Sequence, residues 1–85
     1  MSDQNQKDKV VIHSDVRKII EKLVLKILFE KKSVKTLKLL IDNVLEGAVK
    51  SRITISEKII NKIIQQMNKD NRIQFTQKEG WKIKI

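Results

Sequence analysis

The chain has no cysteine and no proline, only two glycines, and three aromatic residues, none of which is tyrosine. The lack of cysteine excludes disulfides, thiolate metal sites and a cysteine nucleophile. With no proline to interrupt the periodic segments, Gly47 and Gly80 are expected at element boundaries. No apolar run approaches the length of a membrane span, and residues 1–9 are too polar for the apolar core of a signal peptide. We therefore expect a soluble intracellular protein, cytoplasmic or nuclear, that is neither secreted nor bound in a membrane.

Positive charge is what the chain has in excess. The 85 residues suffice for one small core, so one compact surface must carry the function. The formal net charge is +9, and residues 50–85 contribute +6 of it, with nine basic residues against three acidic ones. A clustered cationic surface attracts polyanions, and nucleic acid is the commonest of these inside cells. The alternative is a lysine-rich surface that only keeps a small protein in solution.

Catalytic and metal sites have little support. His13 is the only histidine, and it has neither a cysteine nor a second histidine with which to form a metal site. There is no Gly-rich phosphate loop, and the acidic residues lie among lysines instead of in an apolar segment that would raise a pKa. We expect no enzyme, no metal, no cofactor and no small-molecule substrate.

The N-terminal part predicts one helix after a polar leader. Residues 1–9 are polar and aperiodic, which predicts a disordered leader before a single domain over residues 10–85. Val10 to Ile12 form either a short strand or a cover for the core. Ser14 is a candidate N-cap for a helix over residues 15–30. Its apolar stripe follows the i, i+3, i+4 rule and comprises Val16, Ile19, Ile20, Leu23, Val24, Ile27 and Leu28.

Leu25 and Phe29 lie outside that stripe, one turn apart on the other side of the helix. A second apolar strip of this kind either packs beneath another segment or forms an interface. We favour a cover by Val10 to Ile12 over a homodimer seam.

A second helix is predicted over residues 36–47. Thr36 is its candidate N-cap, and Gly47 is placed where a C-terminal stop is expected. Ser33 and Val34, just before it, are compatible with a strand of one or two residues. Leu39 falls outside the helix's apolar stripe.

The last third predicts a third helix that runs into a hairpin. Thr54-x-x-Glu57 has the spacing of a capping box, which predicts a helix over residues 55–69. Its apolar side is Ile55, Ile59, Ile60, Ile63, Ile64 and Met67. From Ile73 the period changes to two, which predicts a hairpin over residues 72–85 with Gly80 at its turn. In the hairpin, Phe75 is expected to face the core, and Trp81 is expected to anchor the strands to it rather than to stack on a base.

This order of elements, with Thr54-x-x-Glu57 at the third helix and Gln77-Lys78-Glu79-Gly80 at the hairpin tip, resembles the winged-helix family. The resemblance covers residues 14–85 and implies a mainly α fold with a small β-hairpin, an α+β three-helix domain with its wing at the C-terminus. One departure is the stretch from Gly47 to Ile53, since helix-turn-helix proteins usually join these helices by three or four residues. Either the second helix continues past Gly47 or the link is a loop.

In this family the third helix would enter the major groove of duplex DNA and the wing would lie along the adjacent backbone. Lysines neutralise phosphates, and Asn or Gln can pair with adenine. The candidate nucleic-acid-binding residues are Lys50, Arg52, Lys58, Asn61, Lys62, Gln65, Lys69, Lys78, Lys82 and Lys84. The helix face lacks arginine, so we expect phosphate contacts with modest sequence preference and a role such as a small transcriptional regulator.

The alternative is a winged-helix module for protein–protein interaction, acting as a subunit of a larger complex. Residues 53–73 are similar to the matching part of winged helices that bind proteins. Its docking surface would be Leu25 and Phe29 or the exposed face of the third helix, with a homodimer or another protein as partner. The charge of residues 50–85 favours DNA, whereas Glu57 and Glu79 on the contact side do not.

Overall fold

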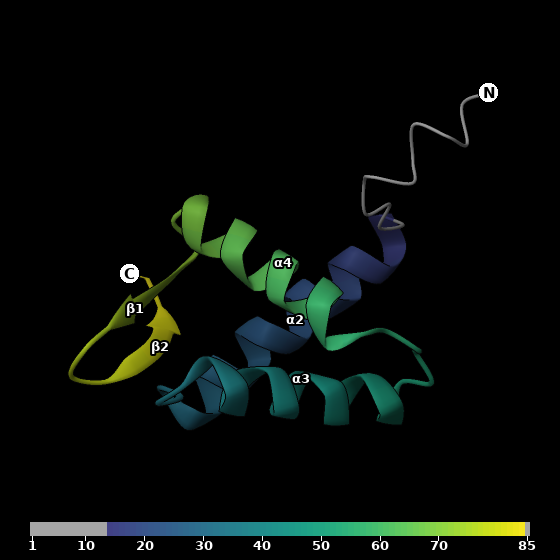
Figure 1. Ribbon diagram of the computed structural model, residues 1–85, viewed down its shortest axis with the longest axis horizontal. Coiled ribbons are helices and arrows are strands. Elements are labelled where there is room, and N and C mark those ends of the chain that lie inside the picture. The colour runs from purple at the N-terminus through teal and green to yellow at the C-terminus, as the bar shows by residue number, and fades with distance from the viewer. Residues whose placement is uncertain (1–13, 85) are drawn as a thin grey trace.

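The computed structural model describes residues 14–84, which form three helices followed by a two-stranded antiparallel hairpin (Figure 1). The predicted fold class, mainly α with a small C-terminal β-hairpin, is confirmed. The elements are α2 (Ser14–Lys31), α3 (Leu37–Lys50), α4 (Glu57–Lys69), β1 (Ile73–Thr76) and β2 (Gly80–Ile83). The leader, Val10 to Ile12, His13 and Ile85 lie outside the described residues.

The helix starts agree with the sequence in one case and differ in two. Thr36 caps α3 as predicted, since its hydroxyl accepts a hydrogen bond from the backbone N–H of Leu39 at 3.1 Å. The capping box at Thr54 is wrong, because Ser56 caps α4 by accepting from the N–H of Ile59 at 3.3 Å. Helix α4 therefore starts two residues later than predicted, at Glu57. Ser14 is already the first residue of α2 and does not precede it.

The prediction that Gly47 stops the second helix is also wrong. Helix α3 continues to Lys50, and Arg52 adopts the left-handed conformation with φ of 59°. The N–H groups of Arg52 and Ile53 then bond the carbonyl oxygens of Val49 and Ala48 at 3.0 and 2.8 Å. This is the Schellman pattern, which normally uses glycine at the left-handed position. A loop of residues 51–56 follows, so the link to α4 is still longer than a tight turn.

Gly47 has a packing role instead. A Cβ atom at this position would lie 3.0 Å from Cδ2 of Leu23 on α2, so the absence of a side chain lets the two helices approach.

Helix α4 ends where the sequence predicted, at the Lys69-Asp70-Asn71 turn. Asn71 takes the left-handed position with φ of 64°, and Arg72 N–H bonds the Met67 carbonyl at 2.9 Å. Asparagine tolerates this conformation better than most residues. The turn leads directly into β1.

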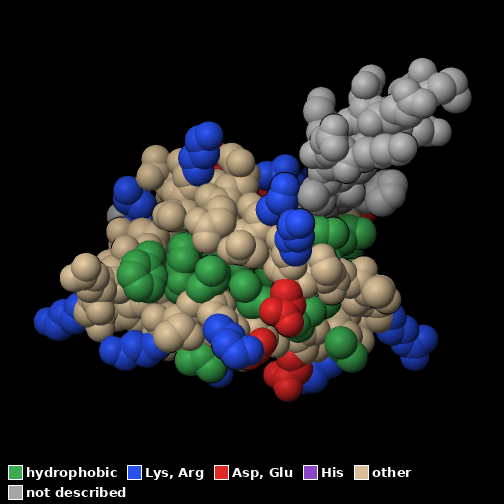
Figure 2. Space-filling view, in the orientation of Figure 1, with side chains coloured by type: hydrophobic (Ala, Val, Ile, Leu, Met, Phe, Trp, Pro, Cys, Tyr) green, Lys and Arg blue, Asp and Glu red, His purple; other side chains and the backbone are tan. Residues whose placement is uncertain are grey.

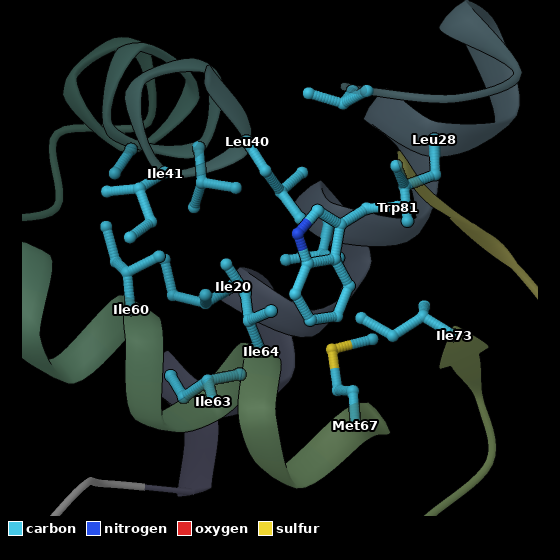
Figure 3. Packing of buried hydrophobic residues seen from close by; sticks show 14 residues of the cluster. Ile20, Leu28, Leu40, Ile41, Ile60, Ile63, Ile64, Met67, Ile73 and Trp81 are labelled. Carbon is cyan, nitrogen blue, oxygen red and sulfur yellow. The ribbon is translucent and has the colours of Figure 1, made fainter. Parts of the chain in front are cut away.

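Trp81 lies at the centre of the core, with 5% of its surface exposed. Its ring packs among Leu40, Ile64, Met67 and Ile73, which come from α3, α4 and β1 (Figure 3). The prediction that Trp81 anchors the hairpin is confirmed. The core as a whole consists of Ile20, Val24, Leu28, Val34, Leu40, Ile41, Val44, Ala48, Ile60, Ile63, Ile64, Met67, Ile73 and Trp81.

The hairpin pairs Ile73 with Ile83 and Phe75 with Trp81, and Gly80 has the positive φ, 89°, expected at its turn. Val34 forms an isolated antiparallel bridge with Trp81, so the short strand of one or two residues considered for Ser33 and Val34 is a single bridging residue. A third strand position thus lies beside β2, and the arrangement is compatible with a winged-helix topology.

Two apolar residues are more exposed than their patterns predicted. Phe75, which pairs with Trp81 and contacts its ring at a centroid distance of 5.3 Å, is 49% exposed. Ile19, from the predicted stripe of α2, is 39% exposed. Leu39, which falls outside the predicted stripe of the second helix, is 48% exposed.

Candidate nucleic-acid interface

The outward face of α4 carries a row of polar and basic side chains. Lys58, Lys62, Gln65 and Lys69 are all exposed, and their spacing of four, three and four residues places them on one line along the helix. The opposite side of α4 is buried at Ile60, Ile63, Ile64 and Met67. Burial of that side fixes the rotation of the helix, so these four polar side chains, which we call the α4 row, must face solvent.

The three lysines of the α4 row keep their charge unneutralised. Among residues 14–84 they take part in no ion pair, since the acidic partners are Glu21, Asp42 and Glu79. Glu57, at the start of α4, and Asp70, the C-cap, are exposed acidic residues that directly adjoin the two ends of the row. An uncompensated row of this kind is what a phosphate backbone would neutralise.

Asn61 is half-buried beside the row, and its Oδ1 accepts a hydrogen bond from Nε2 of Gln65 at 3.1 Å. The two amides therefore hold each other in place one turn apart. Gln65 keeps its carbonyl oxygen, and Asn61 keeps its NH₂ group, for a further partner.

Two of the three hairpin lysines have side-chain partners, which the sequence did not suggest. Nζ of Lys82 lies 2.7 Å from Oε1 of Glu79, and this contact holds the pKa of the Glu79 carboxyl below its ordinary value. Nζ of Lys84 donates to Oδ1 of Asn71 at 3.3 Å, which leaves its charge in place. Lys78, near the tip, is exposed.

Lys50 and Arg52 occupy other surroundings. Lys50 is the last residue of α3 and lines a hollow between α2 and α3, together with Lys26, Glu30 and Glu46. Arg52 is exposed in the loop before α4 and closes the Schellman pattern described above. The structure therefore brings together the α4 residues of the predicted site. Lys50 instead lies at the end of α3, beside the hollow between α2 and α3.

Sequence reasoning missed one ion-pair cluster. Glu21 on α2 accepts from Arg72 at 2.8 Å and from Arg17 at 3.0 Å, which ties the start of the hairpin to the first helix. Burial of the Glu21 carboxylate raises its pKa, but the hydrogen bonds and charges of Arg72 and Arg17 outweigh burial and leave the pKa below its ordinary value. The pair with Arg72 spans 51 residues, so no local spacing signals it.

The visible face of the molecule has an uneven distribution of side chains (Figure 2). Hydrophobic side chains form a band that runs from the hairpin between α4 and α3, and Lys and Arg side chains project above α4. The acidic side chains visible in this view gather over α3 and the start of α4. In this view Lys and Arg side chains lie on both sides of the band, whereas none of the acidic side chains seen here gathers above α4.

Leu25 and Phe29 do not form one strip. Leu25 is half-buried and packs against the core, whereas Phe29 is 77% exposed. The predicted second apolar strip is thus reduced to one exposed aromatic side chain.

No family model, no curated protein and no solved structure matches this chain. Each helix within residues 14–84 is too short or too polar to traverse a bilayer. Within the same residues, no three His, Asp or Glu side chains are grouped so that they would hold a metal ion.

Proposed function

We propose that this protein binds duplex DNA through the α4 row, with the hairpin lying along the neighbouring backbone as a wing. The observation that carries the proposal is the row of exposed lysines on α4, which form no ion pair within residues 14–84 and are backed by a buried apolar side. The helix is rigidly seated, because four of its apolar side chains are in the core. A seated cationic helix presents its charges at fixed spacing, which suits a regular phosphate backbone.

The winged-helix resemblance supplies the docking mode. Three helices and a C-terminal hairpin, with Val34 paired to β2, support it. In that mode α4 would enter the major groove with Lys58, Lys62 and Lys69 on phosphates. Asn61 and Gln65 are the side chains suited to adenine.

The number of free charges favours modest affinity and little sequence preference. Lys82 is paired with Glu79, so Lys78 and Lys84 are the wing lysines available to the backbone. Together with the α4 row this gives a handful of phosphate contacts, which corresponds to non-specific affinities of roughly 10⁻⁴ to 10⁻⁶ M at physiological salt. A small transcriptional regulator or chromatin-associated factor would work as a dimer or within a complex at such affinity.

The test is a titration of labelled duplex DNA of mixed sequence, about 20 base pairs long, at several salt concentrations. The variant is Lys58→Glu with Lys62→Glu. Its matched control is Lys18→Glu with Lys22→Glu, which makes the same charge change at the same four-residue spacing on α2. We expect the α4 variant to lose at least about ten-fold in affinity and the slope of log K against log salt to fall by about two.

The control should keep most of the affinity, apart from a general loss due to its lower net charge. Equal losses in both variants would mean that DNA responds only to net charge, and the α4 assignment would be wrong. No binding of the unmodified protein at low salt would reject DNA as the ligand. The melting curves of both variants should match that of the parent, because all four lysines are exposed.

A further inference from the structure

Helix α2 has an exposed basic face of its own. Lys18, Lys22 and Lys26 follow one another at four-residue spacing on α2, and Phe29 continues the line. Lys32 comes just after the end of the helix. We call these five exposed residues the basic α2 face. The face lies on the side of α2 opposite the buried Ile20, Val24 and Leu28. Lys26, at its edge, also lines the hollow between α2 and α3.

The basic α2 face is unfavourable for the isolated helix. Like charges at i, i+4 destabilise a helix, and the face contains two such pairs in succession. None of its four lysines forms an ion pair within residues 14–84. Glu21, on the same helix, is engaged by Arg17 and Arg72. Asp15 lies three residues before the first lysine of the helix row and Glu30 four residues after the third, so they relieve the repulsion at its two ends and leave the middle lysine between two like charges. An acidic partner would remove the remaining repulsion.

Phe29 adds an apolar anchor to the same face. It is 77% exposed, which makes it the most exposed of the large apolar side chains among the described residues. It borders an open hollow of about 400 Å³ between α2 and β2, whose other lining residues are Leu28, Lys32, Glu79, Lys82 and Ile83. Phe29 and Ile83 supply apolar surface, and Lys32 supplies a cation that forms no ion pair within residues 14–84. The hollow can take one apolar side chain beside a carboxylate.

Two other occupants fit less well. A twofold dimer would bring this face against itself and set lysines against lysines. Duplex DNA offers phosphates to the lysines but little apolar surface to Phe29.

We propose that the basic α2 face binds an acidic segment of a partner protein, with an apolar side chain of that segment in the hollow beside Phe29 and its carboxylates on Lys18, Lys22, Lys26 and Lys32. This site is separate from the α4 row, and it does not depend on DNA binding. The molecule would then hold DNA on one side and an acidic protein segment on the other.

The probe is a synthetic 15-residue peptide in which Glu and Asp flank a central Leu-Phe pair, compared with the same peptide carrying Ser-Ser at the centre. Amide shifts of ¹⁵N-labelled protein locate the site, and titration gives the affinity. We expect shifts along α2 and β2, and a loss of about ten-fold in affinity for the Ser-Ser peptide. The variant Phe29→Ser should lower the affinity for the Leu-Phe peptide by a similar factor. The double variant Lys22→Glu with Lys26→Glu should do the same.

Two matched controls separate this site from the rest of the surface. Leu39→Ser removes an exposed apolar side chain from α3, and Lys58→Glu with Lys62→Glu removes the same charge from α4; both should bind the peptide nearly as the parent does. Shifts centred on α4, or equal binding of the two peptides with no effect of Phe29→Ser, would overturn the proposal. Phe29-dependent self-association in sedimentation would replace it with a homodimer.

Discussion

Val34 and Trp81 exchange two backbone hydrogen bonds. The nitrogen–oxygen distance is 2.9 Å from Val34 N–H to the Trp81 carbonyl and 2.7 Å from Trp81 N–H to the Val34 carbonyl. This pair joins the connection between α2 and α3 to the C-terminal hairpin, across 47 positions of sequence. It also places the backbone of Val34 and Lys35 directly against Gly80. The position of the hairpin therefore depends on a close approach of two backbones.

Gly80→Ala is expected to destabilise the protein by about 2 kcal/mol or more. A Cβ at this position would lie 2.3 Å from the carbonyl oxygen of Val34, and the φ of 89° is one that alanine rarely adopts. Urea unfolding followed by circular dichroism measures the loss. The matched control is Gly47→Ala, whose Cβ would meet only the flexible end of Leu23. The control should change the free energy of unfolding by less than about 1 kcal/mol, because a helical glycine is itself unfavourable. Equal effects would contradict the close approach.

Arg52→Gly is expected to stabilise the protein by about 0.5–1 kcal/mol, because Arg52 holds a left-handed conformation that glycine adopts without strain. Asn71→Gly makes the same change at the end of α4 and should gain less, since asparagine already tolerates this conformation. Melting temperatures of the two variants test the order. A loss of stability in Arg52→Gly would show that its side chain makes a contribution larger than the backbone strain.

Glu21→Gln is expected to lower stability at neutral pH by about 0.5–1 kcal/mol, a value that allows for the partial exposure of both arginines. The folded-state pKa of Glu21 is depressed, so its stabilising effect is full above the unfolded pKa of about 4.3 and is lost as the pH falls through the folded value. The difference between parent and variant should therefore shrink below about pH 4. A difference that stays constant down to pH 2 would exclude the charge interaction as its cause.

Glu79→Gln tests whether the wing contacts DNA. The change frees Lys82 from its ion pair and raises the net charge by one. If the wing lies on the backbone, affinity should rise several-fold and the salt slope should steepen by about one. Asp42→Asn, on α3, frees Lys38 in the same way and should have a smaller effect. Equal effects of the two variants would remove the wing from the interface.

The sequence predicted what local patterns decide. The cap at Thr36, the single bridging residue at Val34 and the buried role of Trp81 follow from residue type, hydrophobic period and turn chemistry, and the structure confirms them. The apolar face of α4 was predicted in the same way, and it fixes which side of that helix faces solvent.

Tertiary contacts decided the rest. Thr54 and Ser56 are both acceptable caps, and the choice follows from the extended run in which Ile53 and Ile55 pack against the core. Gly47 was expected to end a helix, but it lies inside α3 and packs closely against Leu23. Arg52 takes the left-handed position at the end of that helix. Phe75 has the period of a core residue but is 49% exposed.

Trp81 is the only tryptophan of a chain without tyrosine, and it is buried, so the intrinsic fluorescence reports on the surroundings of this one residue. Its indole lies where β2 meets α3 and α4, so its emission follows the attachment of the hairpin to the helices. A ligand on the α4 row or on the basic α2 face should leave this signal almost unchanged. Detachment of the hairpin would shift the Trp81 emission to the red even while the helical signal in the far ultraviolet persists.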